Sequence, residues 1–410
     1  MTQIAVLGHG VVGSGVCEVL EKNAGSIADK AGEAIAVKKI LDKRDFPDCP
    51  YPEKFTKDFQ EIITDPEISV VVEVMGGVHP AYDFGKAALL AGKSVVSSNK
   101  EMVAAKGAEL LRLAEENNVN FLFEASVGGG IPIIRPLHQC LAANRIDEIA
   151  GILNGTTNFI LTKMIKEGMQ FADALLLAQQ LGYAEADPTA DVEGHDACRK
   201  ICILASIAFG SHVYPDTVYT QGITSITAED VQYAESAGCV IKLIGQASQN
   251  EDGKVYALVS PAFISRDSQL AGVDDVFNGI LVRGNATGDV VFYGKGAGKL
   301  PTASAVVADV IDCVKATGTS KSLHWADSDG KNVADYRTHR VTKYVRCAGI
   351  SLERAEAVLG GVKRLTRNDA PDGELAFLTS AIREGELEEK LRELAAGGGN
   401  IITSIRLLDY

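Results

Sequence analysis

Acidic and basic side chains stand directly before a wholly apolar segment in the stretch EADPTADVEGHDACRKICILASIAFG, from Glu185 to Gly210. Asp196 and Lys200 are four residues apart, so they share one face of the helix that this stretch predicts. Because the continuation ICILASIAFG has no polar face, we expect the pair to lie in the interior. Burial and the helix dipole would lower the pKa of Lys200 toward neutrality, which suits a general acid or base. A structural ion pair that closes the domain is the alternative interpretation.

Two other pairs in the same stretch have structural interpretations. His195 and Arg199 lie on a neighbouring helix face, where we expect a surface or helix-end position. Cys198 and Cys202 also share a face, but no His or Cys at a matching spacing completes a metal site. We therefore expect both cysteines to be small buried side chains in a reducing compartment.

The first strand, expected at residues 4–7, ends in a glycine-rich turn that suits a dinucleotide pyrophosphate. The first glycine permits the tight turn, the second lets backbone N–H groups approach the phosphates, and the third lets the next helix lie close. The amino terminus of that helix then faces the negative charge. The cofactor-binding candidates here are Gly8, Gly10, Val11, Val12 and Gly13.

A second strand, expected at residues 35–41, closes with a charged loop. Asp42 stands where an acid would hold the ribose hydroxyls of NAD, whereas Lys43 and Arg44 could hold the extra phosphate of NADP. The sequence leaves this cofactor preference open, and a solvated strand-end loop is the alternative interpretation.

The chain then alternates apolar strands with helices, which indicates a parallel sheet covered on both faces. Ligands bind at the carboxyl ends of such strands, so the residues there are further candidates. They are Met75, Gly76 and Gly77 after one strand, Ser98, Asn99 and Lys100 after the next, and residues 124–130 after a third.

After Pro132 and Pro136 the pattern changes, and a strand expected at residues 146–152 opens into the sequence NGTTN. Exposed backbone and small polar side chains before a helix suit a small anion such as a carboxylate. A helix cap supplied by Thr156 or Thr157 is an equally weighted alternative.

The composition excludes several classes of protein. A length of 410 residues suggests two or three domains, and 46% apolar residues allow a large core. A net charge of −14 argues against nucleic acid or an anionic membrane surface as partner. No signal segment and no apolar run of about 18 residues stands out, so we expect a cytoplasmic protein.

Together, these motifs resemble those of homoserine dehydrogenase over roughly residues 1–320. The resemblance implies NAD(P)-linked interconversion of L-homoserine and L-aspartate 4-semialdehyde, on the route to threonine, methionine and isoleucine. The motifs that carry it are GHGVVG, EVMGG, SNK, EASVGGGIP, NGTTN, the stretch Glu185 to Lys200, and GKGAGKLPTAS at residues 294–304.

The resemblance also implies roles for single residues. Lys200 matches the family's proposed catalytic lysine, with Lys100 of the cofactor and substrate cleft second, while Asp196 and Glu185 match substrate-binding acids. Glu185 would bind the ammonium group of the substrate. Lys100 and the NGTTN backbone would bind its carboxylate. The other implied contacts are Asn154, Gly155 and Thr156 for substrate, Gly298 for cofactor, and Glu124, Val127, Gly129 and Ile131 for a sodium ion held mostly by backbone carbonyls.

Three domains are expected within an α/β fold. A Rossmann-like nucleotide-binding domain spans residues 1–135 and is completed by about 295–320, and an α+β substrate-binding and dimerisation domain spans 136–294. A polar linker at 321–335 leads to a C-terminal domain at 335–410. Its βαββαβ order, with strands expected at 336–346, 361–367, 374–379 and 400–408, resembles an ACT domain.

The usual acid, proline and glycine before the first helix of an ACT domain are replaced here by Ala348-Gly349-Ile350-Ser351-Leu352. Two roles are therefore open for this domain, feedback inhibition by threonine and dimer contact through an added sheet edge. We favour the dimer contact. A homodimer or homotetramer acting on a small molecule is expected.

Three rival functions fit parts of the pattern. They are another NAD(P)-dependent dehydrogenase of an amino or oxo acid, a sensor that binds dinucleotide and amino acid without turnover, and an isomerase that retains NAD. A sensor would have no need of a proton-transfer lysine.

Overall fold

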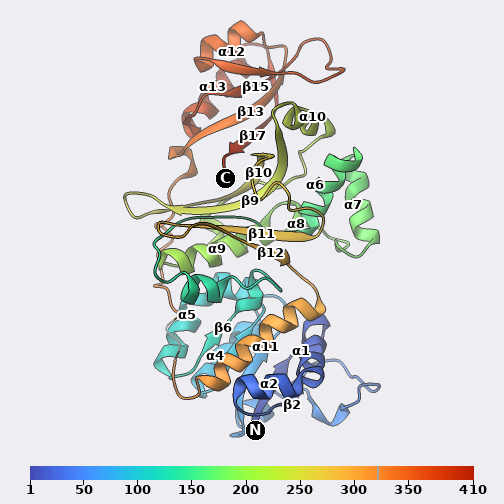
Figure 1. Cartoon of the computed structure of the whole chain (residues 1–410), viewed down its shortest axis with the longest axis vertical. Coiled ribbons are helices and arrows are strands. Elements are labelled where there is room, and N and C mark those ends of the chain that lie inside the picture. The colour runs from blue at the N-terminus through green and yellow to red at the C-terminus, as the bar shows by residue number, and fades with distance from the viewer. Residues whose placement is uncertain (321–322) are drawn as a thin grey trace.

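The computed structural model describes residues 1–320 and 323–410. Figure 1 shows an elongated molecule with the N-terminal part at the bottom, a broad sheet across the middle and the C-terminal strands and helices at the top. The described residues form two main sheets, one of six strands and one of eleven.

The six-stranded sheet is parallel throughout, as the sequence predicts, with the strand order β3-β2-β1-β4-β5-β6. The order reverses direction between β1 and β4, which is where open α/β sheets bind their ligands. Its strands are β1 (Thr2–Leu7), β2 (Ile35–Leu41), β3 (Phe55–Thr56), β4 (Ile68–Glu73), β5 (Ser94–Ser97) and β6 (Phe121–Leu122).

Helices cover both faces of this sheet because alternate residues of β1 enter different cores. Ile4 and Val6 pack with α1, α2 and α11, whereas Ala5 and Leu7 pack on the side of α3, α4 and α5. These helices are α1 (Val11–Lys22), α2 (Ala24–Ala31), α3 (Gln60–Ile63), α4 (Ala81–Leu90), α5 (Lys100–Glu116) and α11 (Lys299–Lys315). The late helix α11 therefore returns to the N-terminal sheet and lies against α1.

The middle part is built mainly on antiparallel strands with helices over one face. The sheet order there is β12-β11-β7-β9-β10, and α9 contacts β7, β9 and β10. The strands are β7 (Ile146–Ile152), β8 (Tyr219–Thr220), β9 (Cys239–Gln249), β10 (Val255–Ser265), β11 (Phe277–Gly284) and β12 (Gly288–Lys295). The helices are α6 (Gly155–Glu167), α7 (Phe171–Gln180), α8 (Thr189–Val192), α9 (His195–Phe209) and α10 (Ala228–Ser236).

The C-terminal part continues the same sheet in the order β17-β13-β15-β14, and β17 pairs with β10 in parallel. The β17 edge is thus used within the chain, so the predicted edge-to-edge dimer contact cannot use it. The elements are β13 (Arg340–Ala348), α12 (Leu352–Leu359), β14 (Val362–Leu365), β15 (Glu374–Thr379), β16 (Ile382–Arg383), α13 (Glu384–Ala396) and β17 (Asn400–Leu408).

Two expectations for this end of the chain were wrong. The strand predicted from Tyr336 begins only at Arg340, because the side chain of Asp335 accepts a hydrogen bond from the Arg337 N–H and fixes a short 3-10 turn at Tyr336–Thr338. The segment predicted as a polar linker contains the buried Trp325, whose indole N–H donates to His212 at 3.0 Å. Lys321 and Ser322, which begin that predicted linker, lie outside the described residues.

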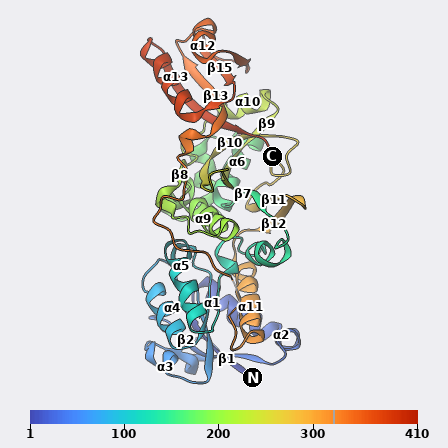
Figure 2. The same ribbon diagram turned by 90° about the vertical axis from the view of Figure 1, so that its left-hand side faces the viewer.

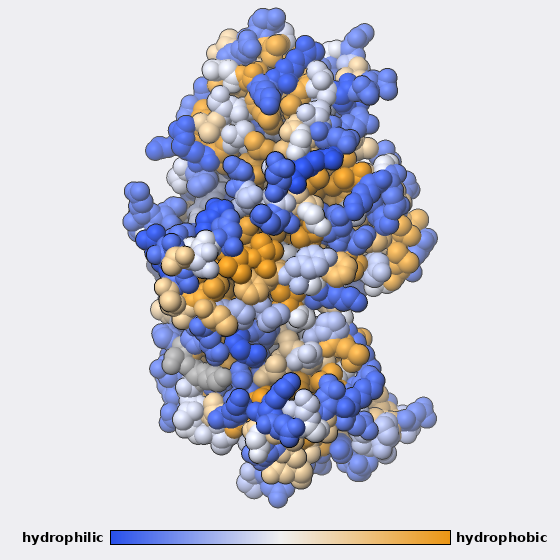
Figure 3. All heavy atoms as spheres, viewed as in Figure 1, coloured by the Kyte–Doolittle hydropathy of each residue, from blue (hydrophilic) through white to orange (hydrophobic). Residues whose placement is uncertain are grey.

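The face drawn in Figure 3 is mostly hydrophilic at both ends, and hydrophobic residues gather across the middle of the molecule. Among the described residues, no helix is both long enough and apolar enough to cross a membrane.

Candidate active site

The glycine-rich turn has the geometry that its spacing predicts. Gly8 adopts a φ of +97°, and a Cβ on Gly13 would lie 1.9 Å from the Gly8 carbonyl oxygen, so α1 approaches β1 too closely for any side chain there. A Cβ on Gly10 would meet no atom within 4 Å. Open space beside Gly10, at the amino terminus of α1, fits a phosphate group. Of the other two candidates in the turn, Val11 is exposed and Val12 is half-buried.

The loop after β2 is organised by Asp42. Its carboxylate accepts hydrogen bonds from the His9 N–H at 2.7 Å and from the side chain of Arg44 at 2.9 and 3.0 Å. Hydrogen bonding to Arg44 holds the pKa of Asp42 well below its usual range. Lys43 is exposed beside this pair. The Asp42 carboxylate is therefore engaged by Arg44, while the side chains of Lys43 and Arg44 are exposed to solvent.

The loops after β4 and β5 are tied to each other. The Asn99 side chain caps α5 by accepting from the Met102 N–H at 3.1 Å, and its amide donates to the Gly77 carbonyl at 2.6 Å. Ser98 donates its N–H to the Glu73 carbonyl at 3.3 Å. Lys100 is the first residue of α5, and α5 lies next to α9 in both ribbon views (Figure 2).

Lys100 and Lys200 meet on one buried carboxylate. The Lys100 Nζ lies 2.6 Å from Asp196 Oδ1, and the Lys200 Nζ lies 2.8 Å from Asp196 Oδ2. Lys200 also donates to the Leu153 carbonyl at 2.7 Å. Asp196 is 3% exposed and Lys200 is 7% exposed, so the pair lies inside the protein as its sequence context predicts. The cluster joins the N-terminal sheet to the middle part of the chain.

Burial gives these charged groups unusual acid strengths. Burial lowers the pKa of Lys200, and the charge of Lys100 adds to this against the opposing pull of Asp196. Burial would likewise lower the pKa of Lys100, but the negative charge of Asp196 outweighs it and raises that pKa. For Asp196, burial is outweighed by the two ammonium groups, and its pKa lies well below the usual range. Lys200 is thus the lysine that gives up its proton more readily.

Asn154 has a larger part in the cluster than the sequence indicated. Its amide donates to Asp196 at 2.9 Å and to Asp191 at 2.7 Å, while its oxygen accepts from the Thr157 N–H at 2.8 Å. The cap of α6 is therefore Asn154, and the expectation of a cap from Thr156 or Thr157 was wrong. Thr156 instead donates its hydroxyl to the Tyr183 carbonyl at 2.6 Å.

Asp191 is the residue that sequence reasoning missed. Burial raises the pKa of this carboxyl, and Asn154 holds it beside Asp196. The only signal for it was its place five residues before Asp196 in the same charged stretch. Glu185, by contrast, is exposed on the loop before α8, and no interaction of its side chain with the cluster occurs among the residues that the structure describes.

The residues of α9 that adjoin Asp196 and Lys200 have the structural roles expected from the sequence. His195 is exposed, and Arg199 forms an ion pair with Glu101 at 3.4 Å. Cys198 and Cys202 are buried free thiols. Within the described part of the chain, no three His, Cys, Asp or Glu side chains form a group that could hold a metal ion.

In the loop predicted to hold sodium, backbone carbonyls and not the Glu124 carboxylate are the oxygens left without an N–H donor among the described residues. The Glu124 carboxylate is fully engaged, since it accepts the N–H groups of Ile133, Ile134 and Arg135 at 2.6 to 2.8 Å. No backbone N–H of the described residues donates to the carbonyls of Val127, Gly129 or Ile131. Free carbonyl oxygens are suitable ligands for a hard cation.

Gly129 is required by its surroundings. Its φ is +56°, and a Cβ on it would lie 2.3 Å from the Gly296 carbonyl oxygen. The glycine lets this loop lie against the segment that leads to Gly298, which precedes the first turn of α11.

Comparison with known proteins assigns the family. The sequence model described as "Homoserine dehydrogenase" matches residues 132–311, and the model of its NAD-binding domain matches residues 8–124. A homoserine dehydrogenase from Synechocystis sp. is 50% identical over 317 residues, which are 76% of this chain and 73% of the relative. The chain belongs to the homoserine dehydrogenase family.

Solved structures agree with this assignment. A homoserine dehydrogenase from Thiobacillus denitrificans has a TM-score of 0.91 and 36% identity, covering 100% of this chain and 98% of that one. A hyperthermophilic archaeal homoserine dehydrogenase in complex with NADPH has a TM-score of 0.64 and 30% identity, covering 76% of this chain and 97% of that one. This chain is thus an NAD(P)-dependent oxidoreductase that acts on a CH–OH group.

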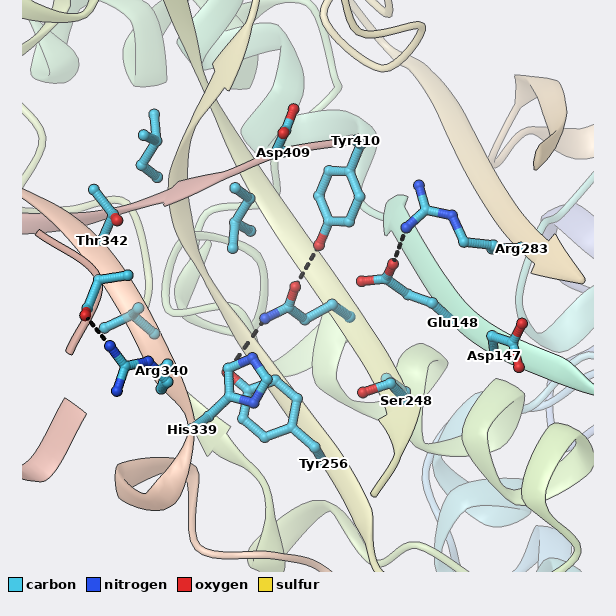
Figure 4. Close-up of a pocket in the computed structure, with 16 residues that line it drawn as sticks. Asp147, Glu148, Ser248, Tyr256, Arg283, His339, Arg340, Thr342, Asp409 and Tyr410 are labelled. Atoms are coloured by element: carbon cyan, nitrogen blue, oxygen red, sulfur yellow. Dashed lines mark hydrogen bonds and ion pairs between the residues drawn. The ribbon is translucent and has the colours of Figure 1, made fainter. Parts of the chain in front are cut away.

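A separate pocket of about 440 Å³ lies between the middle strands and the C-terminal strands. Figure 4 shows Tyr410 and Tyr256 directed toward one another along one side, with His339 stacked on Tyr256 at 4.1 Å between ring centres. It shares no lining residue with the Asp196 cluster.

Proposed function

We propose that this homoserine dehydrogenase interconverts L-homoserine and L-aspartate 4-semialdehyde with Lys200 as the general acid and base. The observation that carries the proposal is the buried contact of Lys100 and Lys200 with Asp196, where the N-terminal sheet meets the middle part. A lysine whose pKa is lowered by burial in this position gives up its proton more readily than an ordinary lysine, as a general acid and base requires. Production of threonine, methionine and isoleucine is the proposed metabolic role.

The residues of the cluster have distinct parts in the reaction. The dinucleotide, when bound, accepts or supplies the hydride at the carbon that bears the hydroxyl. In homoserine oxidation, the Lys200 Nζ takes the hydroxyl proton as the carbonyl forms, and in the reverse reaction it returns that proton to the oxygen. Asp196 fixes the position of Lys200 and balances the charge it gains. Lys100 is the second candidate for this proton transfer.

The zwitterionic substrate explains why charges of both signs lie together. Lys100 and the backbone around Asn154, Gly155 and Thr156 are proposed to bind its carboxylate, while Asp191 and Glu185 bind its ammonium. Glu185 is exposed and would have to turn toward the substrate, whereas Asp191 is already held in place by Asn154.

NADP is the cofactor that the β2 loop fits better. Because Asp42 is occupied by Arg44 and His9, its oxygens are not free for ribose hydroxyls, and the exposed Lys43 with Arg44 can approach a 2′-phosphate. The other proposed contacts are the glycine turn, Met75 to Gly77, Ser98 to Lys100, and Gly298.

Three further properties are proposals. Val127, Gly129 and Ile131 would hold a sodium ion by their carbonyl oxygens, with Glu124 supplying only its backbone. The enzyme is proposed to be cytoplasmic and to form a homodimer or homotetramer. Size-exclusion chromatography with light scattering would measure the number of subunits.

Two glycine substitutions separate folding from cofactor binding. Gly13→Ala is expected to lower the free energy of unfolding by about 1–3 kcal/mol, because its Cβ would overlap the Gly8 carbonyl. Gly10→Ala is expected to change stability by less than about 1 kcal/mol but to weaken NADPH binding about tenfold, because its Cβ occupies the phosphate space. Urea unfolding and fluorescence titration measure the two effects. Unchanged NADPH affinity in Gly10→Ala would contradict this placement of the phosphates.

The pH dependence should have opposite signs in the two directions. Homoserine oxidation requires neutral Lys200, so kcat rises with pH, by at most about tenfold per unit, and levels off above the lowered pKa of Lys200. Semialdehyde reduction requires protonated Lys200, so kcat falls above that same pKa. Rate profiles between pH 6 and 10 in both directions test this, and parallel profiles would count against Lys200.

The activity itself is tested by NADPH and NADH oxidation with L-aspartate 4-semialdehyde. Turnover with NADPH as the better cofactor supports the proposal. Tight dinucleotide binding without turnover would favour the sensor, and turnover only with another oxo acid would favour a different dehydrogenase. Conversion of substrate without net NAD(P)H consumption would favour an isomerase.

A further inference from the structure

A buried carboxyl group lies at the centre of the parallel sheet, in a position that the proposed reaction does not use. Glu73 is the last residue of β4, where it pairs in register with Leu7 of β1 on one side and Ser97 of β5 on the other. Its side chain is fully buried. Three strand ends that carry the cofactor loops therefore meet at this residue.

The carboxyl group binds to the loops on both sides. Glu73 Oε1 accepts the Met75 N–H at 2.7 Å, and Oε2 accepts the Ser97 hydroxyl at 2.5 Å. The Ser97 oxygen in turn accepts the Asn99 N–H at 3.0 Å. Since the Asn99 amide also donates to the Gly77 carbonyl, the two loops form one closed network around the Glu73 side chain.

This network reaches the rest of the site. A Cβ on Gly8 would lie 3.1 Å from the Met75 Cγ, so the Glu73 loop packs against the glycine turn. On the other side, Asn99 caps α5, whose first residue Lys100 binds Asp196. A dinucleotide that runs from the glycine turn toward Lys100 must pass over the end of β4.

The electrostatic setting makes Glu73 sensitive to that ligand. Burial raises its pKa to about 7, although the hydrogen bonds from Ser97, Met75 and Asn99 favour the ionised form. These three are the groups that face the carboxyl among the described residues, and none of them is charged at neutral pH. A diphosphate brought above this site adds negative charge, which disfavours a second buried anion.

We propose that Glu73 is a positioning residue for the dinucleotide: its carboxyl group holds the two cofactor loops together and takes up a proton when the anionic cofactor binds. The inference rests on the proposed function, because it requires NADPH to lie across the loop from Met75 to Gly77. The proton comes from solvent as the complex forms.

The test is the NADPH dissociation constant of the full-length enzyme, measured by fluorescence titration from pH 6.5 to 9. The wild type is expected to bind about tenfold more weakly at the upper end, the change that a one-unit rise in pKa on binding produces. Glu73→Gln is neutral throughout and keeps an acceptor for Met75 and a donor for Ser97. It should bind like the wild type at pH 6.5 and show no pH dependence.

Two variants separate position from charge. Glu73→Ala breaks the network and is expected to bind NADPH about tenfold more weakly than the wild type at pH 6.5, with no pH dependence, because it lacks the titrating carboxyl group. If that variant does not fold, Ser97→Ala removes the hydroxyl between Glu73 and Asn99 with a smaller change in volume, and it should also weaken binding. Asp309→Asn is the matched control, because burial raises the pKa of Asp309 to about 7 too, but this residue lies on α11. It should keep the wild-type pH dependence.

The outcomes distinguish this inference from the proposed function. A wild-type affinity that does not change with pH, or a Glu73→Gln variant with the wild-type slope, overturns the role of Glu73 while leaving the dehydrogenase in place. Failure of the wild type to bind either NADPH or NADH at any pH overturns both.

Discussion

Replacing Lys200 with alanine is expected to lower kcat in both directions by about 100-fold or more. The variant loses the only buried amine that combines a lowered pKa with contact to Asp196 in the described part of the chain. Lys100 remains on the same carboxylate, but its raised pKa makes it a poor proton donor at neutral pH. Steady-state kinetics with homoserine and with the semialdehyde measure the effect.

A matched control is Lys343→Met. Lys343 is also buried, its pKa is also lowered by burial, and it binds Glu384 at 2.7 Å in the C-terminal part. Arg406 still pairs with Glu384 in that variant, so the remaining carboxylate keeps a partner. We expect near wild-type kcat. A Lys200→Ala enzyme with kcat within about threefold of the wild type would exclude Lys200 as the proton-transfer group.

Replacing Asp196 with asparagine is expected to impair both stability and catalysis. The carboxylate is the shared partner of two ammonium groups in a buried site, and removing one member of a buried ion pair costs about 3 kcal/mol. Without that negative charge the pKa of Lys200 falls further, so semialdehyde reduction loses its protonated lysine. We expect kcat/KM to fall by about 100-fold or more, with urea unfolding reporting the loss of stability.

Asp230→Asn is the control that separates the loss of stability in Asp196→Asn from its loss of catalysis. Asp230 is a buried acid on α10 that accepts the Tyr344 hydroxyl at 2.9 Å and lies 3.3 Å from Arg346. Its substitution should lower stability without changing kcat. An Asp196→Asn enzyme that is destabilised but fully active would reduce the Asp196 cluster to a structural ion pair.

Local sequence signals were sufficient for five of the six described strands of the N-terminal sheet and for the buried lysine. Those five strands are short, mostly apolar runs that end in a glycine-rich or polar turn, and these features depend on neighbouring residues only. The edge strand β3 was not predicted, because its two residues, Phe55 and Thr56, form no such run. The interior position of Lys200 followed from the apolar helix after it, because a helix without a polar face must be covered on all sides. The comparisons confirm the family that the combined motifs indicated.

Long-range contacts account for what the sequence did not reveal. The joining of β17 to β10, across more than 130 residues of chain, leaves no local trace in either strand. The segment around Trp325 was predicted to be a polar linker because the partners of Trp325, Gly107 and His212, are more than 100 residues away in the sequence. Asp191 was missed for the same reason, since only the fold brings Asn154 between it and Asp196.

The most direct test of the catalytic role of Lys200 is rescue of Lys200→Ala by added primary amines. The account predicts that small amines enter the space left by the side chain and restore homoserine oxidation in proportion to their concentration. It also predicts that the rescued rate increases with the basicity of the amine, as general base catalysis requires. A residual rate that stays the same at every amine concentration, in a variant that still binds NADPH, would contradict the assignment of proton transfer to Lys200.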